Sequence, residues 1–229
     1  GGGGYSGDRT QMRGWAGWYR AQGFATLSID YTLLADDSPS PLYPLPELDV
    51  RAAVQWGHLQ AERLGYENVL LHGSSAGARL GAIALTSSGV GGNTSGDLWG
   101  SARDDANGFI GFYGYYDGDT LEAERYYGGL RGDGDPAVDA RWAGADSVAN
   151  AAEATGPVLL FHGDVDGLIN VAQTERFGSA LAEAGRDVTA HIVTDGDHAF
   201  DGRYGDLTTA TGDQAADVIA AWLATRFPI

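Results

Sequence analysis

The sequence predicts an α/β fold in which a mostly parallel sheet is flanked by helices on both faces. Short apolar runs of strand length alternate along the chain with longer segments of helical periodicity. This alternation is typical of parallel strands joined by crossover helices. The length of 229 residues suits one domain, and 6 Trp, 11 Tyr and 7 Phe can fill a substantial core. Neither an internal repeat nor a second domain is evident, so residues 1–229 are expected to form one unit.

Apolar runs between polar or Gly-containing stretches predict the strands, which in chain order are Phe24–Tyr31, Asn68–His72, Phe109–Tyr113, Val158–Phe161 and Val188–Val193. Helical spacing and small residues predict the helices, which are Pro46–Leu64, Ala78–Leu85, Val171–Ala184 and Gln214–Phe227. Pro46 suits the first position of its helix, and Gly65 and Gly185 can end the helices before them. Residues 89–108 are polar and Gly-rich, so a loop is expected there.

One pentapeptide, Gly73-Ser74-Ser75-Ala76-Gly77, lies between a predicted strand and a predicted helix. A G-x-S-x-G sequence in this context is typical of a nucleophile elbow, a turn so sharp that its serine adopts a strained backbone. Small residues two positions away on either side are then required, and Gly73 and Gly77 meet that demand. A chance occurrence is the alternative in a chain with 36 Gly, but the strand before and the helix after favour the elbow.

A nucleophilic serine requires a histidine to accept its proton and a carboxylate to orient that histidine. After an elbow the chain order is Ser, then Asp or Glu, then His. Of the 5 His, one precedes Ser75 within a predicted helix and three lie in or beside predicted strands: His58, His72, His162 and His191. His162 is expected to brace the loop after its strand. His198, in a Gly- and Asp-rich loop near the C-terminus, is therefore the predicted base.

Two carboxylates follow the strand that ends near His162, and either can be the acid. These are Asp164 and Asp166, and spacing alone does not separate them. Asp195 and Asp197 are further candidates, but they lie so close to His198 in sequence that we expect them to shape its turn.

Four stretches together resemble the α/β-hydrolase superfamily, and more narrowly its esterase/lipase branch with hormone-sensitive-lipase-like and feruloyl- or acetyl-esterase-like enzymes. They are an oxyanion-loop-like glycine run, the elbow, a His-Gly-x-x-Asp acid loop and a Gly-x-His-x-Phe base loop: Gly1–Ser6, Gly73–Gly77, His162–Asp166 and Gly196–Phe200. The resemblance implies an α/β-hydrolase fold and selects Asp166 over Asp164. It also implies an oxyanion hole made by the N–H groups of Gly3 and Gly4 together with that of Ala76, the residue after the nucleophile.

The resemblance departs at its start. In the family the oxyanion loop begins with His and follows a third strand, whereas here the corresponding position is Gly1. We therefore expect a chain that begins mid-protein, lacks its N-terminal strands and leaves a gap in the sheet between Phe24–Tyr31 and Asn68–His72. Unpaired buried backbone groups would make such a gap costly. A genuinely shortened variant is the alternative.

Residues 115–150 are rich in Gly and Asp, with Tyr126, Tyr127 and Trp142 interspersed. They follow a strand whose C-terminal end should face the active site. Because long loops in compact domains tend to be functional, a small cap insertion is expected. A surface excursion without function is the alternative.

The formal net charge is −17, and all 14 basic residues are Arg. A surface without a basic stripe excludes nucleic acid and anionic membranes as expected partners. Arg79, at the start of the elbow helix, is expected to pack or to form an ion pair and not to bind phosphate. Abundant Asp without Lys indicates a halophile or a high-GC genome, with codon bias as the simpler explanation.

The chain has 0 Cys, which excludes a disulfide framework and a Cys-based metal site. Asp117-Gly118-Asp119 and Asp133-Gly134-Asp135 lack the rest of a calcium-loop pattern and are predicted turns. No metal or cofactor is therefore expected. No apolar stretch is long enough to span a membrane. The cytoplasm is the favoured location, although a missing native N-terminus would hide a signal peptide.

The sequence thus predicts a serine hydrolase that cleaves a small-molecule carboxylic ester through Ser75, His198 and Asp166. Amide cleavage, as in arylformamidase- or peptidase-like relatives, is the alternative because the same triad serves both reactions. A non-catalytic binding protein on this fold is the third hypothesis, and loss of a triad member would favour it.

Overall fold

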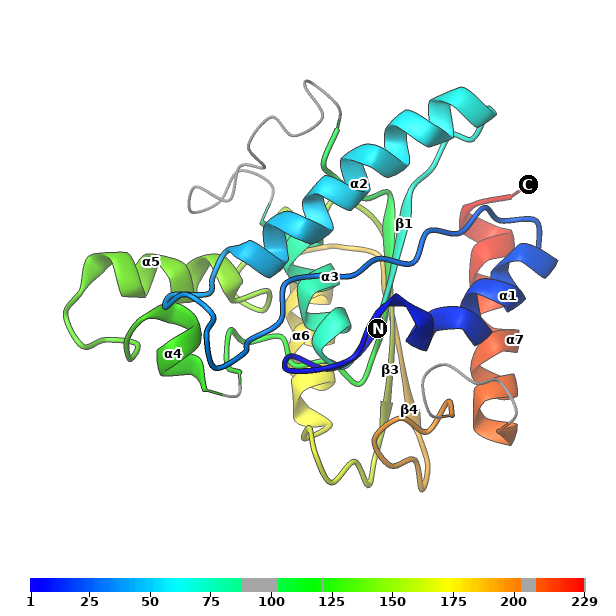
Figure 1. The fold of residues 1–229 in the computed structure, drawn as a ribbon. Helices are drawn as coiled ribbons and strands as arrows, with labels where there is room; N and C mark the ends of the chain where they lie inside the picture. Colours follow the sequence, from blue (N-terminus) through cyan, green and yellow to red (C-terminus); the bar gives the residue numbers. More distant parts are fainter. Residues whose placement is uncertain (88–102, 121, 203–208, 229) are drawn as a thin grey trace.

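The structure is a computed structural model of the chain and describes residues 1–87, 103–120, 122–202 and 209–228. These residues contain a four-stranded parallel sheet in the order β1-β2-β3-β4 (Figure 1). The strands are β1 (Leu70–Ser74), β2 (Gly108–Phe112), β3 (Val158–Gly163) and β4 (Val188–Val193). Each lies within two residues of its predicted position. All three strand pairs are parallel, so the carboxyl ends of these strands meet at one edge of the sheet.

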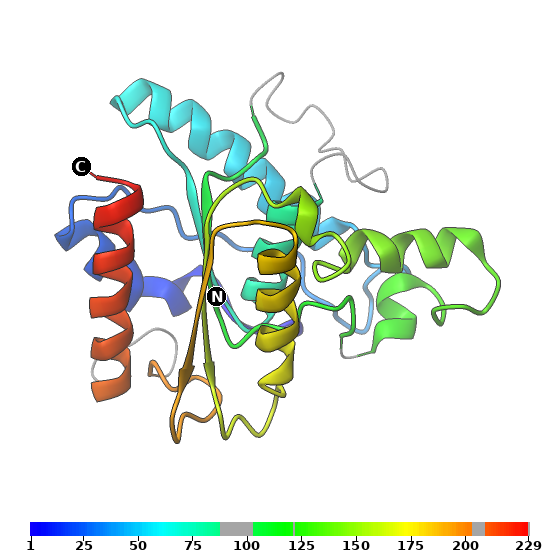
Figure 2. The ribbon, with the colours of Figure 1, turned by 180° about the vertical axis from the view of Figure 1, so that it is seen from behind.

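Helices cover both faces of the sheet, as Figures 1 and 2 show, so the predicted fold class is confirmed. α1 and α7 pack on one face and α3 and α6 on the other, where α2 lies against α3. The helices are α1 (Arg13–Ala21), α2 (Leu45–Leu64), α3 (Ala76–Thr86), α4 (Ala123–Tyr127), α5 (Pro136–Ala145), α6 (Ala172–Glu183) and α7 (Ala210–Arg226), with short 3-10 helices η1 (Arg9–Met12) and η2 (Ala151–Glu153). None of the described helices is long and apolar enough to cross a membrane.

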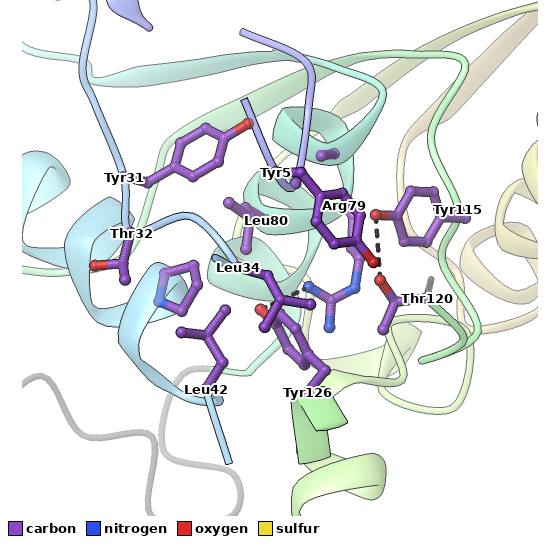
Figure 3. Close-up of a pocket in the computed structure, with 13 residues that line it drawn as sticks. Tyr5, Tyr31, Thr32, Leu34, Leu42, Arg79, Leu80, Tyr115, Thr120 and Tyr126 are labelled. Atoms are coloured by element: carbon purple, nitrogen blue, oxygen red, sulfur yellow. Dashed lines mark hydrogen bonds between the residues drawn. The ribbon is translucent and has the colours of Figure 1, made fainter. Parts of the chain in front are cut away.

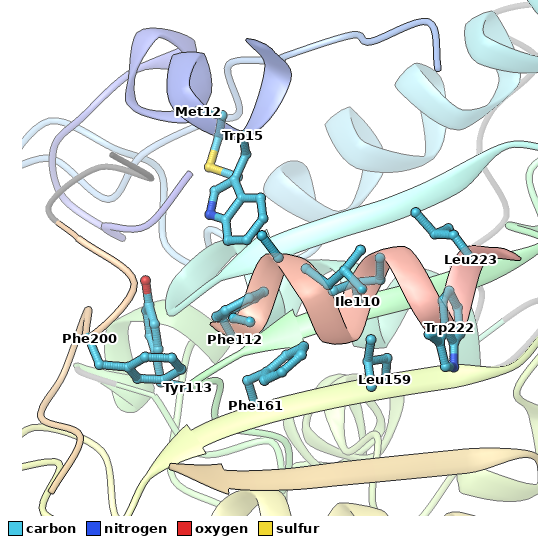
Figure 4. Packing of buried hydrophobic residues seen from close by; sticks show 13 residues of the cluster. Met12, Trp15, Ile110, Phe112, Tyr113, Leu159, Phe161, Phe200, Trp222 and Leu223 are labelled. Atoms are coloured by element: carbon cyan, nitrogen blue, oxygen red, sulfur yellow. The ribbon is translucent and has the colours of Figure 1, made fainter. Parts of the chain in front are cut away.

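The two-residue period of the strands divides the core between the two faces. Ile110 and Phe112 of β2 pack with Trp15 of α1 and Trp222 of α7 (Figure 4). Phe109, the residue before Ile110, packs on the opposite face with α3 and α6. Nearly continuous apolar runs such as this one are therefore what a strand buried on both faces requires.

Helix boundaries follow the expected capping residues. Gly65 ends α2 in the left-handed conformation, with φ of 79°. α7 begins four residues before its predicted start, because the Thr209 side chain accepts a hydrogen bond from the backbone N–H of Gly212 and caps the helix there. Most of the predicted loop 89–108 lies outside the described residues.

The predicted strand over Phe24–Tyr31 is wrong. The segment pairs with no strand among the described residues, and β1 stands at the edge of the sheet. Its polar groups bond to side chains and loops instead: the Ser28 hydroxyl donates to the Arg9 carbonyl, and the Asp30 carboxylate accepts from the Arg9 N–H. An alternating apolar pattern predicts an extended chain, but a strand also needs a hydrogen-bonded neighbour, which the pattern does not supply.

Residues 115–150 fold into α4 and α5, which lie together beside the elbow helix (Figure 1). The rings of Tyr127 and Trp142 from this segment are in contact, with centroids 4.4 Å apart and planes inclined by 36°. They pack with Leu42 and Ile83 into a separate apolar cluster. The segment is therefore tied to the main domain by a core of its own.

Candidate active site

Ser75 occupies the turn between β1 and α3. Its backbone lies at φ 54° and ψ −119°, a strained region for a residue with a side chain. The turn is held because the Ser75 N–H donates to the Phe112 carbonyl of β2 at 2.9 Å. A Cβ added to Gly73 would lie 2.2 Å from the carbonyl oxygen of Gly77, so the backbones touch where the pattern requires glycine. This is the geometry of a nucleophile elbow.

His198 lies between Ser75 and Asp166. Its Nε2 is 3.2 Å from the Ser75 Oγ, and its Nδ1 is 2.8 Å from the Asp166 Oδ2. The Asp166 side chain is fully buried, whereas that of His198 is 19% exposed. The three residues that the sequence singled out are therefore brought together at the carboxyl edge of the sheet.

The two candidate carboxylates take different places. The Asp166 Oδ1 accepts from the N–H groups of Leu168 and Ile169, each at 2.8 Å, which fixes the side chain and leaves Oδ2 toward His198. Asp164 instead accepts from the N–H of Asp195 at 2.7 Å and joins two loops. Only one of the pair therefore contacts the histidine.

His162 braces the acid loop, as its position predicted. The ring is buried. Its Nε2 lies 2.9 Å from the Ile169 carbonyl oxygen, and its Nδ1 lies 2.7 Å from the Thr174 hydroxyl. Its Nε2 also lies 3.2 Å from the Asp166 Oδ2, a contact that the sequence did not predict. Burial lowers the pKa of His162, so the ring is held as a neutral donor beneath the carboxylate.

The glycine run passes directly beside the elbow. A Cβ added to Gly2 would lie 3.2 Å from the Ser75 Cβ. The Tyr31 hydroxyl donates to the Gly3 carbonyl at 2.7 Å, and the Leu34 N–H donates to the Gly4 carbonyl at 2.8 Å. The Gly3 carbonyl and the Gly4 N–H belong to one trans peptide, in which the C=O and N–H point in opposite directions. The hydrogen bond from Tyr31 to the Gly3 carbonyl therefore leaves the Gly4 N–H pointing away from Tyr31.

Ala76 is the first residue of α3. A backbone N–H at this position has no acceptor within its own helix and is available to an anion. Gly4 and Ala76 line one pocket, so the glycine run and the helix N-terminus border the same space. Gly4 and Ala76 therefore border one space, whereas the glycine against Ser75 is Gly2, and the assignment of Gly3 and Gly4 to the oxyanion hole stays a prediction.

That pocket contains about 430 Å³ of empty space open to solvent (Figure 3). Its walls are aromatic and aliphatic, from Tyr5, Tyr31, Leu34, Leu42, Tyr115 and Tyr126. Tyr115, Thr120 and Tyr126 come from the 115–150 segment, which therefore forms one side of the pocket.

Arg79 borders the pocket and is buried with Glu47. Their side chains are 3% and 1% exposed, and the Arg79 guanidinium lies 3.2 Å from the Glu47 carboxylate. The Tyr126 and Tyr127 hydroxyls complete the network, at 3.1 and 2.6 Å from the guanidinium. The prediction that Arg79 forms an ion pair is confirmed.

The sequence matches a known protein family. The BD-FAE family model matches residues 1–181. The chain belongs to the BD-FAE family. BD-FAE is an α/β-hydrolase esterase family, so the resemblance seen in the sequence is confirmed, and membership identifies the chain as a carboxylic ester hydrolase.

Solved structures share the fold of this BD-FAE protein. Propionate-bound esterase Est2 of the planctomycete Thermogutta terrifontis has a TM-score of 0.82 and 19% identity, over 100% of this chain and 82% of that one. The same esterase phosphonylated by cyclosarin has a TM-score of 0.79 and 18% identity, over 100% of this chain and 81% of that one. The acetyl ester-xyloside bifunctional hydrolase of Caldicellulosiruptor lactoaceticus has a TM-score of 0.76 and 21% identity, over 100% of this chain and 81% of that one. No sequence among curated proteins matches.

Several side chains at this BD-FAE site were missed from the sequence. Tyr113 packs on the imidazole of His198, and the Tyr113 hydroxyl donates a hydrogen bond to Asp201. Tyr31, which fixes the glycine run, lay in a segment misread as a strand. Within the described parts of the chain, no cluster of His, Cys, Asp and Glu is arranged to hold a metal ion.

Proposed function

We propose that this BD-FAE protein hydrolyses carboxylic esters through Ser75, His198 and Asp166 by way of an acyl-enzyme. The observation that carries the proposal is the position of the His198 ring, which is 3.2 Å from the Ser75 Oγ on one side and 2.8 Å from the Asp166 Oδ2 on the other. A histidine held in this way can take the proton of the serine while the carboxylate fixes its tautomer.

In the first half-reaction the Ser75 Oγ attacks the ester carbonyl carbon as His198 Nε2 takes its proton. The carbonyl oxygen becomes an oxyanion, and the N–H groups of Ala76, Gly3 and Gly4 are the donors that we assign to it. Collapse of this intermediate breaks the bond to the alcohol oxygen, which receives the proton from His198. The acyl group is left on Ser75.

In the second half-reaction water attacks the acyl carbon and gives its proton to His198. The second tetrahedral intermediate breaks the bond to the Ser75 Oγ, which recovers that proton, and the carboxylic acid leaves. Asp166 keeps its charge throughout and stabilises the imidazolium in both halves.

The pocket bordered by Gly4 and Ala76 favours esters with a short group on that side. Leu34 and Leu42 line this pocket, and their side chains are 3% and 1% exposed. Close packing makes such walls hard to displace. We therefore propose short acyl esters as the preferred substrates.

A chromogenic ester panel from acetyl to long acyl, with the matching anilides, tests the function. Ester hydrolysis that falls with acyl length is expected, with Leu34→Ala shifting the preference toward longer chains. A serine-directed organophosphonate should label Ser75, and Ser75→Ala should lose both the label and several orders of magnitude in kcat. Ser74→Ala, which removes the neighbouring hydroxyl, should still be labelled. Hydrolysis by Ser75→Ala at the wild-type rate, or faster cleavage of anilides than of esters, would overturn the proposal.

A further inference from the structure

Asp201 is a buried carboxylate close to the triad that the proposed mechanism does not use. It is 0% exposed and lies three residues after His198. Its two oxygens each accept a hydrogen bond, one from the Tyr113 hydroxyl at 2.6 Å and one from the Trp15 indole N–H at 2.8 Å. An acid with two donors on its two oxygens is best satisfied as the carboxylate anion.

Tyr113 connects this carboxylate to the catalytic histidine. Its ring centroid is 4.7 Å from that of His198, and the two planes are inclined by 60°. The tyrosine is 3% exposed, so it forms the floor under the imidazole. Tyr113 and Trp15 lie at the same end of the core cluster, where they approach from β2 and α1 (Figure 4).

The backbone at Tyr113 is strained. Its φ is 39°, in the left-handed region that bulky residues rarely adopt. The conformation is held by the N–H of Tyr113, which donates to the Phe161 carbonyl at 2.7 Å, and by the bond from its hydroxyl to Asp201. Strain kept at such a position is commonly found where a side chain must be aimed precisely at a site.

These contacts link helix α1 to the catalytic histidine. Trp15, Asp201 and Tyr113 form one chain of hydrogen bonds, and His198 packs on the ring of Tyr113 at its end.

We propose that Asp201 and Tyr113 are positioning residues for His198, and that the buried negative charge of Asp201 stabilises the imidazolium formed during turnover. Asp201 interacts electrostatically with His198, and burial leaves that interaction poorly screened. Burial raises the pKa of Asp201 itself, and the bonds from Tyr113 and Trp15 oppose that shift. The inference rests on the proposed function, since it assigns a second support to the same base.

Other titratable groups also approach His198 among the residues that the structure describes. Asp166 and His162 lie on the acid-loop side, and exposed Asp197 accepts from the His198 backbone N–H at 2.7 Å. Asp201 differs from Asp197 because it is reached through Tyr113 and shielded from solvent.

The test compares Asp201→Asn with Asp195→Asn, in kcat and kcat/KM against pH. Asparagine has the shape of aspartate, and its oxygen can accept from Trp15 while its amide donates to Tyr113. Asp195 is a matched control because it lies three residues before His198 but is exposed, and asparagine tolerates its positive φ of 57°. The rates are divided by the concentration of active sites, which is measured by titration with an organophosphonate.

Asp201→Asn removes a buried negative charge that favours the imidazolium over the neutral ring. The acid limb of kcat/KM for Asp201→Asn is therefore expected to move down by about half a pH unit. The plateau kcat should fall roughly tenfold as the imidazolium loses support and the ring is less well placed. Asp195→Asn should leave the limb in place. An Asp201→Asn profile that overlays the wild type, or an equal shift in Asp195→Asn, would overturn the proposal.

Tyr113→Phe is the second variant, and it serves if Asp201→Asn does not fold. It keeps the ring but removes the hydroxyl that fixes it, so kcat should fall severalfold while KM stays unchanged. An unchanged kcat overturns the positioning role. Failure of the triad itself would be seen separately, as wild-type turnover by Ser75→Ala.

Discussion

The backbone of Gly77 lies directly against the carbonyl oxygen of Gly1: a Cβ added to Gly77 would come within 2.1 Å of that oxygen. The same glycine already faces Gly73 across the elbow, where a Cβ on Gly73 would lie 2.2 Å from the Gly77 carbonyl oxygen. Gly77 therefore meets two demands, one from the turn and one from the glycine run that we assign to the oxyanion hole.

We predict that Gly77→Ala lowers kcat by about two orders of magnitude, the cost expected when oxyanion donors are displaced. The added methyl group must push the Gly1–Gly4 run away from Ser75, while substrate binding elsewhere is retained. Steady-state kinetics on a short acyl ester measures the effect. Gly178→Ala is the control, because its Cβ would lie 3.9 Å from the nearest atom, Ala190 Cβ, in the middle of helix α6. Full activity in Gly77→Ala would contradict the assignment of the glycine run.

The acid loop offers a second comparison. Asp166→Asn should lower kcat by about 10⁴-fold, because an amide N–H facing His198 favours the wrong tautomer. Asp164→Asn should cost far less, since the Asp164 carboxylate accepts the Asp195 N–H at 2.7 Å and an amide oxygen can accept the same bond. Circular dichroism and thermal melts establish that both variants fold. Equal losses in the two variants, or a larger loss in Asp164→Asn, would move the acid to Asp164.

Much of the site was predictable because the relevant residues follow strands of a parallel sheet. Ser75, Asp166 and His198 lie one, three and five residues after the ends of β1, β3 and β4, so the topology brings them to one edge. The strand at Phe24–Tyr31 was misread because periodicity describes a chain's local shape and not its pairing partner.

The support beneath the triad could not be predicted in this way. Tyr113 reaches His198 from a strained backbone conformation, and Asp201 reads as an ordinary loop carboxylate until its neighbours are known. Glu47 meets Arg79 across 32 residues of sequence, a distance over which no periodic pattern carries information. Such contacts are set by tertiary packing, and sequence spacing alone does not encode them.

The buried pair of Glu47 and Arg79 leads to a stability prediction. Burial raises the pKa of Glu47, and the guanidinium opposes that shift and keeps the pair together. Glu47→Gln leaves a buried unpaired cation and should lower the free energy of unfolding by about 3–5 kcal/mol. Glu122→Gln, which breaks the exposed pair with Arg125, should cost no more than about 0.5 kcal/mol.

Urea unfolding of Glu47→Gln, Arg79→Met and the double variant checks this account. The double variant removes both charges, so it should lose less than the sum of the single losses. Additive losses would show that the pair acts by packing and not through its charges.

The excess of carboxylates predicts that salt stabilises the fold. There are 31 acidic and 14 basic residues, so 31 − 14 = 17 carboxylates lack a basic counterpart even if every arginine were paired. The screening length of their mutual repulsion is about 10 Å at 0.1 M salt and about 3 Å at 1 M salt. The melting temperature at pH 7 should therefore rise by several degrees across this range. Sodium chloride and sodium sulfate at equal ionic strength separate screening, which is common to both, from the added effect of sulfate on apolar burial. The rise should shrink near pH 4.5, where many carboxylates are protonated and less repulsion remains to be screened. A melting temperature that does not change with sodium chloride at pH 7 would mean that the acidic composition does not limit stability, and codon bias would then better explain the absence of lysine.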